Sequence, residues 1–287
     1  MTFDEVIGHM VFLSRYQEIR SPLPNPLLSV MLNDMPTITT HDDGMPIWID
    51  INVETLEQHH DLRAFLSALY GWTWDVSGPE MGHYAIASHD GQPVLGVGQG
   101  EGARGEATTY FKTSTIDETF DQAIELGSSI VFPVSPVSDI GTMAIMTDPF
   151  GARFGLWQPA TFNGFGVVYE ANAPGWFDHV SSDPAAAGEF YASITGHTLF
   201  SPDPDMRILQ NGEQWFASIS ESQTGAGPQW NPIMVVDSLK RIHETVPRLG
   251  GAILIEEMPV PGSSLCVFSE PVNGTMMTVM QGGDHPD

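Results

Sequence analysis

Hydrophobic and polar residues alternate from Ile47 to Val53, which is the period of a strand with one buried face. Between residues 56 and 70 the apolar positions recur at helical spacing, and Gly71 follows where a helix C-cap is expected. Three short apolar runs separated by turn residues come next, at 71–77, 82–88 and 93–99. The pattern predicts a strand, a helix and three strands in that order.

The same order is predicted a second time before residue 160. A strand at 108–114 and a helix at 117–126 lead into three strands at 130–134, 142–147 and 152–158. The whole arrangement then recurs, because Pro46-Ile47-Trp48-Ile49-Asp50 is echoed by Pro174-Gly175-Trp176-Phe177-Asp178, 128 positions later. We therefore predict an α+β protein built from two tandem copies of one module, at 45–160 and 173–282.

Residues 1–44 lie outside this duplication. One helical face is shared by the apolar residues Phe3, Val6, Ile7, Met10 and Leu13, which predicts an N-terminal helix. A proline-rich linker at 21–26 follows it. Packing against the rest of the chain is one interpretation of this helix, and a lid or a dimer contact is the other.

Charge narrows the classes of partner. The 287 residues include 36 acidic and 10 basic side chains, which give a formal net charge of −26. Binding to nucleic acid or to an anionic membrane requires a surface rich in Lys and Arg, so neither partner is expected. Cys266 is the single cysteine, and the sequence has neither a signal-like start nor a long apolar run. These features predict a cytoplasmic protein without disulfides.

Three stretches carry a family resemblance: Gly141-Thr142-Met143, the run from Asp148 to Gln158, and Glu189-Phe190-Tyr191 ahead of Gly196. Together with the duplicated element order, they resemble the vicinal oxygen chelate superfamily, which includes glyoxalase I, extradiol dioxygenases and bleomycin resistance proteins. They resemble in particular a two-module actinobacterial branch that is glyoxalase-like. The resemblance covers about 45–282. It implies that each module pairs two β-α-β-β-β units in a sheet curved around a cavity.

The resemblance also shows which positions would hold a metal ion. Metal-dependent members hold a divalent ion with a His on the first strand, a second ligand on the first strand of the second half, and a Glu on the last strand. In this sequence those positions fall, module by module, at Trp48, Thr109 and Gly155, and at Trp176, Pro232 and Thr278. None of these side chains is a usual ligand for such an ion. The pairs His59-His60 and Asp178-His179 lack ligand geometry, so we expect neither a metal nor another cofactor.

The period of two indicates which side chains share each cavity with those positions. In the first module they are Trp48, Asp50, Asn52, Thr109, Phe111, Arg153 and Trp157; in the second they are Trp176, Asp178, Met234, Met276, Thr278 and Met280. An aromatic and thioether pocket with one carboxylate is typical of a small-molecule site. For the two tryptophans on the first strands, filling of the core is an equal alternative.

Two aspartates and one histidine are candidate catalytic residues. Asp50 has Arg153 as a candidate ion-pair partner, whereas Asp178 has Met276 at the matching position. Asp178 is therefore the better candidate for a general base whose pKa is raised by burial. His83 is a candidate acid or base at the cavity mouth, and simple exposure is its alternative interpretation.

These residues favour a metal-free protein that binds a small aromatic or amphipathic molecule. The alternative is a metal-independent tailoring enzyme, such as an isomerase, cyclase or lyase, with a cavity aspartate as general base. A divalent-metal glyoxalase or dioxygenase ranks third. The negative charge favours cationic or neutral ligands. The sequence is compatible with a monomer or a homodimer, since tandem modules can complete their sites within one chain.

Overall fold

The computed structural model describes residues 41–100, 106–221, 227–260 and 263–282. The N-terminal helix predicted from Phe3 to Leu13 and the linker at 21–26 lie outside these residues. No helix within the described ranges is long and apolar enough to cross a membrane.

The first sheet has eight strands in the order β2-β3-β4-β1-β5-β8-β7-β6. Its first half consists of β1 (Pro46–Val53), α3 (Leu56–Tyr70), β2 (Thr73–Val76), the 3₁₀ turn η1 (Pro79–Met81), β3 (Ala85–His89) and β4 (Gln92–Gln99). Its second half consists of β5 (Ala107–Lys112), α4 (Ile116–Glu125), β6 (Ser129–Val137), β7 (Gly141–Thr147) and β8 (Arg153–Pro159). The predicted elements between 47 and 158 are all present.

The second sheet repeats this order as β10-β11-β12-β9-β13-β16-β15-β14. Its first half consists of β9 (Pro174–Ser181), α5 (Pro184–Thr195), β10 (Thr198–Asp203), β11 (Met206–Asn211) and β12 (Gln214–Glu221). Its second half consists of β13 (Gln229–Val236), α6 (Leu239–Arg248), β14 (Ala252–Val260), β15 (Ser263–Ser269) and β16 (Met276–Gln281).

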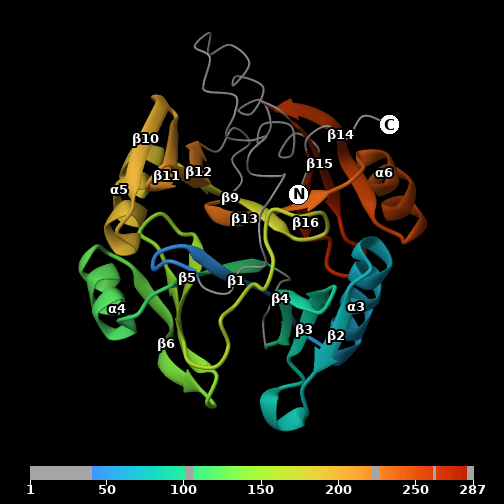
Figure 1. The fold of residues 1–287 in the computed structure, drawn as a ribbon, viewed down its shortest axis with the longest axis horizontal. Coiled ribbons are helices and arrows are strands. Elements are labelled where there is room, and N and C mark those ends of the chain that lie inside the picture. The colour runs from blue at the N-terminus through green and yellow to red at the C-terminus, as the bar shows by residue number, and fades with distance from the viewer. Residues whose placement is uncertain (1–40, 101–105, 222–226, 261–262, 283–287) are drawn as a thin grey trace.

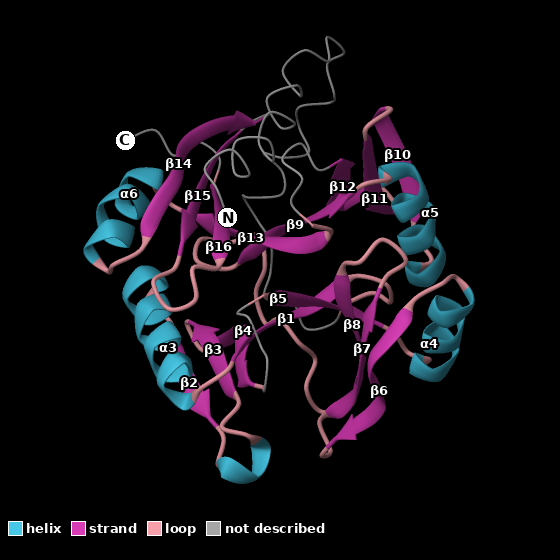
Figure 2. Cartoon of the chain, turned by 180° about the vertical axis from the view of Figure 1, so that it is seen from behind, coloured by secondary structure: helices cyan, strands magenta, loops and turns pink. Residues whose placement is uncertain are grey.

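Each sheet joins two β-α-β-β-β units through its central strands. β1 pairs antiparallel with β5, and β9 pairs in the same way with β13. Figures 1 and 2 show both sheets curving, with the helices on their outer sides. We call the helix-covered side of each sheet its outer face, the opposite side its inner face, and the two sheets with their helices module 1 and module 2. The predicted α+β fold of tandem modules is confirmed.

The helix ends explain why the repeat was visible in the sequence. Thr55 caps α3 with a capping box that includes Gln58, and Gly71 ends the helix with φ 76°. In module 2 the Asp183 side chain caps α5, and Gly196 ends it with φ 72°. A left-handed residue is needed at both C-termini, and glycine adopts that conformation at little cost.

The two modules pack against each other through their outer faces and helices. β5 contacts β13, α3 contacts α6, and α4 contacts α5. At the centre, the Phe111 ring lies 5.1 Å from Trp230 and 5.7 Å from Tyr191. One apolar core therefore runs through both modules.

A buried polar network crosses the same interface. His179 Nε2 lies 2.9 Å from Asp148 Oδ2, and the Tyr191 hydroxyl donates to that oxygen at 2.9 Å. Trp230 Nε1 donates in turn to the Tyr191 hydroxyl oxygen at 2.9 Å. Asp148 belongs to module 1 and the other three residues to module 2, so this network fixes the two modules to one another.

Candidate functional site

The strand register shows which side chains face inward. Trp48 pairs with Tyr110 of β5, and Tyr110 pairs with Gly155 of β8. In module 2 Trp176 pairs with Ile233 of β13, which pairs with Thr278 of β16. Directly paired residues point to the same side of a sheet. Each of these rows of three therefore crosses the centre of one inner face.

Three predicted inward positions are wrong by one residue. Thr109 and Phe111 flank Tyr110 and point to the outer face, where both are buried and Phe111 packs against Trp230. Met234 follows Ile233 and belongs to the same outer core. A shift of one residue moves a side chain to the opposite side of a strand. Tyr110 and Ile233 are the inward residues that the sequence missed.

In module 1 a buried carboxylate accepts hydrogen bonds from two side chains. Trp48 Nε1 donates to Asp50 Oδ1 at 3.0 Å, and the Tyr84 hydroxyl donates to the same oxygen. Trp48 Nε1 also lies 2.7 Å from the Tyr84 hydroxyl oxygen. Burial raises the pKa of Asp50, and hydrogen bonding from Tyr84 and Trp48 offsets part of that rise.

The predicted ion pair between Asp50 and Arg153 is wrong. Arg153 is exposed at the start of β8, and the side chains that donate to Asp50 within the described residues are Tyr84 and Trp48. A loop that precedes β3 carries Tyr84 across the inner face, where its hydroxyl bonds to the carboxylate. The buried carboxylate thus has neutral hydrogen-bond donors in place of a cation.

Aromatic rings fill the inner face of module 1. A Cβ atom added to Gly96 would collide with the Tyr84 hydroxyl, and one added to Gly155 would collide with the Tyr110 ring. Phe162 covers Trp48 edge to face, with ring centroids 4.8 Å apart, and its carbonyl accepts from Trp157 Nε1 at 3.1 Å. Trp48 therefore fills the core, which was the alternative interpretation of this residue, and Trp157 belongs to the same core.

In module 2 the equivalent carboxylate is held by a serine. The Ser218 hydroxyl donates to Asp178 Oδ1 at 2.6 Å and accepts from Trp176 Nε1 at 2.9 Å. Burial raises the pKa of Asp178 to about 7, although the Ser218 hydrogen bond lowers it in part. Trp176 and Asp178 are both half-buried, whereas Trp48 and Asp50 are buried. The Trp-hydroxyl-Asp arrangement of module 2 is therefore the more accessible one.

Two separate apolar clusters flank this arrangement. On the β14–β16 side, Ile233, Met258, Leu265 and Val267 pack with Trp176, Met276 and Met280. On the β10–β12 side, Met206 and Ile208 pack with Phe200 and Trp215, whose rings stack at 5.1 Å. Neither cluster belongs to the main core. Asp178 and Ser218 thus lie on a polar strip between two apolar walls.

Known proteins are similar to this chain in sequence and in fold. No protein-family model matches the chain. It is 26% identical over 261 residues to the Mycobacterium bovis protein named "Putative glyoxylase CFP32", covering 86% of this chain and 98% of that protein. It is 27% identical over 248 residues to the anthracycline biosynthesis protein DnrV of Streptomyces peucetius, covering 78% and 88%.

Solved structures extend the likeness over the same modules. The 2,2',3-trihydroxybiphenyl 1,2-dioxygenase of Sphingomonas wittichii superposes with a TM-score of 0.59 at 14% identity, over 85% of this chain and 92% of that one. The Mn(II)-bound glyoxalase of Novosphingobium aromaticivorans gives 0.61 at 13%, over 84% and 83%. The solved structures show a shared fold, and the named relatives support the resemblance to the vicinal oxygen chelate superfamily.

The metal site of metal-dependent vicinal oxygen chelate proteins is not reproduced by these residues. The central rows of the inner faces are Trp48, Tyr110 and Gly155 in module 1, and Trp176, Ile233 and Thr278 in module 2. Such a site needs several carboxylate or imidazole ligands, and neither row offers one. Within the described ranges, His, Cys, Asp and Glu form no group of three that could hold an ion.

Three histidines singled out in the sequence lie outside these central rows. His83 adopts φ 57° in the turn before β3 and is half-buried, and the neighbouring Tyr84 is the residue that reaches Asp50. His59 is buried, and its Nε2 atom lies 3.1 Å from the Val97 carbonyl oxygen. His179 points to the outer face and bonds to Asp148.

Four predicted ligand-binding residues meet at a groove between the modules. The groove measures about 580 Å³ where β8, β13 and β16 begin, and its lining includes Arg153, Met234, Met276 and Thr278. Met276 and Thr278 are half-buried on β16, so the groove adjoins the inner face of module 2. Asn52 lies elsewhere, with its side chain against Gly98 on the inner face of module 1.

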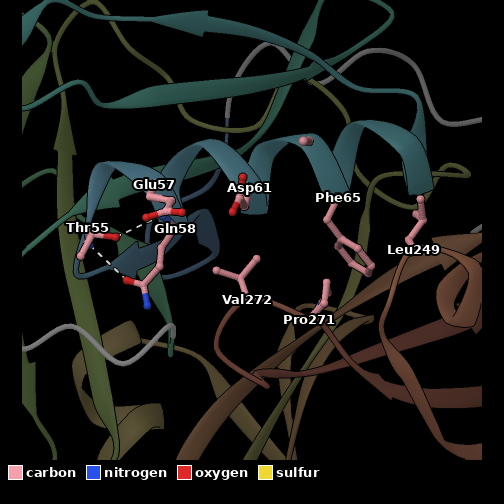
Figure 3. A pocket seen from close by; sticks show the side chains of 9 residues that line it. Thr55, Glu57, Gln58, Asp61, Phe65, Leu249, Pro271 and Val272 are labelled. Atoms are coloured by element: carbon pink, nitrogen blue, oxygen red, sulfur yellow. Dashed lines mark hydrogen bonds between the residues drawn. The ribbon is translucent and has the colours of Figure 1, made fainter.

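A second cleft, of about 670 Å³, lies between α3 and the loop at Pro271 and Val272 (Figure 3). Its wall on α3 carries the acidic residues Glu57 and Asp61. None of the predicted site residues lines it.

Proposed function

We propose that this protein binds a small aromatic or amphipathic molecule on the inner face of module 2, without a metal. One observation carries the proposal: the hydrogen-bonded residues Trp176, Ser218 and Asp178 lie half-buried between two apolar clusters. Apolar walls with a few placed polar groups are the usual composition of a small-molecule site. In module 1 the corresponding space is taken by Tyr84 and Tyr110.

The side chains of module 2 favour a flat ligand with at least one polar group. Trp176 and the stacked pair Phe200 and Trp215 offer ring faces, and Met276 and Met280 offer polarizable thioethers. With a pKa of about 7, Asp178 presents both a carboxylate and a carboxylic acid near neutral pH. A cationic amine or a ligand hydroxyl is a partner for these two forms, and the net charge of −26 favours cationic over anionic ligands.

The Streptomyces relatives support this choice of ligand class. The names of DnrV and DauV refer to anthracycline biosynthesis, and these proteins are 27% and 28% identical to this chain. An anthracycline is a planar polycyclic aromatic molecule that carries an amino sugar. It combines the ring area and the positive charge that the module 2 residues favour.

Calorimetric titration with an anthracycline tests this function. The wild-type protein is expected to bind, and Asp178→Asn is expected to weaken binding by at least about tenfold, since it removes the charge that pairs with an amine. Asp50→Asn is the matched control, because it changes the equivalent aspartate of module 1. Absence of binding by the wild-type protein, or equal losses in both variants, would contradict the proposal.

One observation favours proton transfer as a second candidate function. A carboxylate with a pKa of about 7 beside a hydroxyl group is suited to take a proton from an acidic C–H or O–H group of a bound molecule and return it. Isomerases, cyclases and lyases use this chemistry. If Asp178→Asn keeps ligand binding but abolishes conversion of that ligand, the protein is an enzyme; if no conversion occurs in the wild type, binding alone is its function.

A further inference from the structure

The groove between the modules adjoins the residues proposed to bind the ligand in module 2. Asn231 of β13 pairs directly with Asp178 of β9, and Ser218 of β12 pairs with Asp178 from the other side. Directly paired residues point to the same side of a sheet, with Cβ atoms about 5 Å apart. Because Asn231 also lines the groove, the groove begins beside Asp178 and extends toward the start of β16.

Amide and hydroxyl side chains predominate among the polar residues of the groove. They are Thr147, Gln229, Asn231, Asn273, Thr275 and Thr278. The charged side chains of the lining are Glu106 and Arg153, which are both exposed and opposite in sign. Amides and hydroxyls both donate and accept hydrogen bonds. A lining with these groups and no net charge suits a neutral part of a ligand that is rich in hydroxyls.

The pair Asp178 and Asn231 offers complementary groups side by side. Among the described residues, Ser218 is the one donor to Asp178, and its bond goes to Oδ1. The other carboxylate oxygen therefore remains for a ligand donor. The neighbouring Asn231 carries an amide that donates as well as accepts. Adjacent hydroxyl or amino groups of a sugar ring match this pair, since one donates to the carboxylate and the next accepts from the amide.

Module 1 has no such arrangement. Thr108 pairs with Asp50 at the position where Asn231 pairs with Asp178. Thr108 is 1% exposed and does not line the groove, whereas Asn231 is half-buried and does. The polar extension of the inner face toward the groove therefore belongs to module 2 alone.

We propose that the ligand of module 2 is an aromatic glycoside whose sugar lies in the groove between the modules. This inference rests on the proposed function and gives the ligand an orientation. The groove lies on the β13 and β16 side of β9, and the stacked rings of Phe200 and Trp215 lie on the β10–β12 side. Asp178 stands between them on β9, so the sugar meets Asp178 and Asn231 while the flat ring system extends toward the stacked pair.

The groove, of about 580 Å³, lies within the usual size range of small-molecule sites, roughly 300–1,000 Å³. Its hydrogen-bonding side chains are expected to discriminate against a ligand without the sugar, because such a ligand leaves them without partners after displacing water. The groove thus determines specificity, and the ring faces of the inner face contribute affinity for any flat aromatic molecule.

Fluorescence titration with three related probes tests this orientation. They are doxorubicin, its N-acetyl derivative, which keeps the sugar without the positive charge, and its sugar-free aglycone. Asn231→Ala and Thr278→Val are expected to weaken binding of both glycosides by about five- to tenfold and to leave binding of the aglycone unchanged. Thr278→Val keeps the shape of the side chain, so it tests the groove even if Asn231→Ala disturbs β13.

Asn163→Ala is the matched control, since Asn163 is exposed and does not line the groove. It is expected to bind all three probes like the wild type. Equal losses for the glycosides and the aglycone in the groove variants would place the ring system in the groove and overturn the proposal. Unchanged glycoside binding in both groove variants overturns it as well, and if Asp178→Asn still weakens binding, the proposed function stands without it. A wild-type protein that binds no probe contradicts both.

Discussion

Gly96 of β4 and Ser218 of β12 occupy equivalent positions, each beside the aspartate on the central strand of its module. In module 2 the Ser218 hydroxyl joins Trp176 to Asp178. In module 1 the glycine leaves space for Tyr84, whose hydroxyl contacts both Trp48 and Asp50. Both modules thus contain a tryptophan, a hydroxyl group and an aspartate joined by hydrogen bonds, but the hydroxyl group comes from Tyr84 in module 1 and from Ser218 in module 2. As a result, an aromatic ring covers the aspartate of module 1 only.

Gly96→Ala is expected to destabilise the protein. The new methyl group would occupy the place of the Tyr84 hydroxyl and displace that ring from Asp50. Overpacking of this kind costs about 1–3 kcal/mol in the free energy of unfolding, measured by urea denaturation. Gly227→Ala is the matched control, because a Cβ atom there meets nothing within 4 Å. Equal stability of the two variants would contradict the tight placement of Tyr84.

Ser218→Ala is expected to raise the pKa of Asp178 above its value of about 7. The Ser218 hydroxyl is the hydrogen-bond donor that lowers this pKa, so its removal leaves burial unopposed. NMR titration of the Asp178 carboxyl carbon measures the change. Ser220→Ala, a buried serine on the same strand, serves as the control and is expected to leave the value unchanged. A pKa that falls in Ser218→Ala would refute this role.

Asp178 is expected to make the protein less stable as the pH rises from about 4 to about 7. The ordinary pKa of this carboxyl group is 3.8, and burial in the fold raises it to about 7. The folded protein therefore binds the proton more tightly than the unfolded chain does, and this contribution to stability is lost as the proton dissociates. Asp178→Asn removes this dependence and is expected to be more stable than the wild type above pH 7, by at most about 4 kcal/mol. Urea denaturation across this pH range tests the expectation, and an unchanged pH dependence in the variant would contradict it.

Asp148→Ala is expected to weaken the junction between the modules. The Asp148 carboxylate accepts from His179, from Tyr191 and from the backbone N–H groups of residues 150–152. Removal of this buried carboxylate leaves all of these donors without their acceptor and is expected to cost about 3–5 kcal/mol. Tyr191→Phe keeps the carboxylate but removes the hydroxyl that donates to Asp148 and accepts from Trp230, and is expected to cost less, about 1–3 kcal/mol. Thermal denaturation measures both. Asp121→Ala, on the exposed side of α4, is the control.

Asp148 also gives a second pH dependence of opposite sign. The hydrogen bond and charge of His179 hold the pKa of Asp148 below its ordinary value of 3.8 despite burial. The stability that this carboxylate contributes is therefore present above that value and is lost as the pH falls through the lowered pKa.

The element order and the repeat could be predicted because their signals are local. Gly71 and Gly196 mark two helix ends with the same left-handed conformation. Trp48 and Trp176 precede the N-cap residues of these helices, Thr55 and Asp183, by the same number of positions. Such signals depend on neighbouring residues alone. Tandem copies also corroborate one another, since an element found in one copy is expected in the other.

The inward residues of β5 could not be predicted with the same certainty. This strand lies at the centre of its sheet and is buried on both faces, so Thr109, Tyr110 and Phe111 are all buried and no alternation marks the inner side. Tyr84 reaches Asp50 from a loop 34 positions away, and this contact depends on the path of the chain in space. The duplication could have pointed to Ser218, because it stands beside Asp178 at the position that Gly96 holds beside Asp50.

Metal analysis of the purified protein is expected to find no stoichiometric Fe, Mn, Ni or Zn. The two central rows of the inner faces carry tryptophan, tyrosine, glycine, isoleucine and threonine, which are poor ligands for these ions. Addition of each metal, or of a chelator, is expected to leave the thermal midpoint unchanged, since an ion that binds the folded state would raise it. One tightly bound ion per chain would contradict this account.

The central claim is that module 2 holds the ligand and module 1 does not. Calorimetric titration of an anthracycline into Trp176→Leu and Trp48→Leu tests it most directly, since these tryptophans are equivalent in the two modules. The account predicts that Trp176→Leu loses at least about tenfold in affinity, or about 1.4 kcal/mol, while Trp48→Leu binds like the wild type. A larger loss in Trp48→Leu than in Trp176→Leu would contradict it.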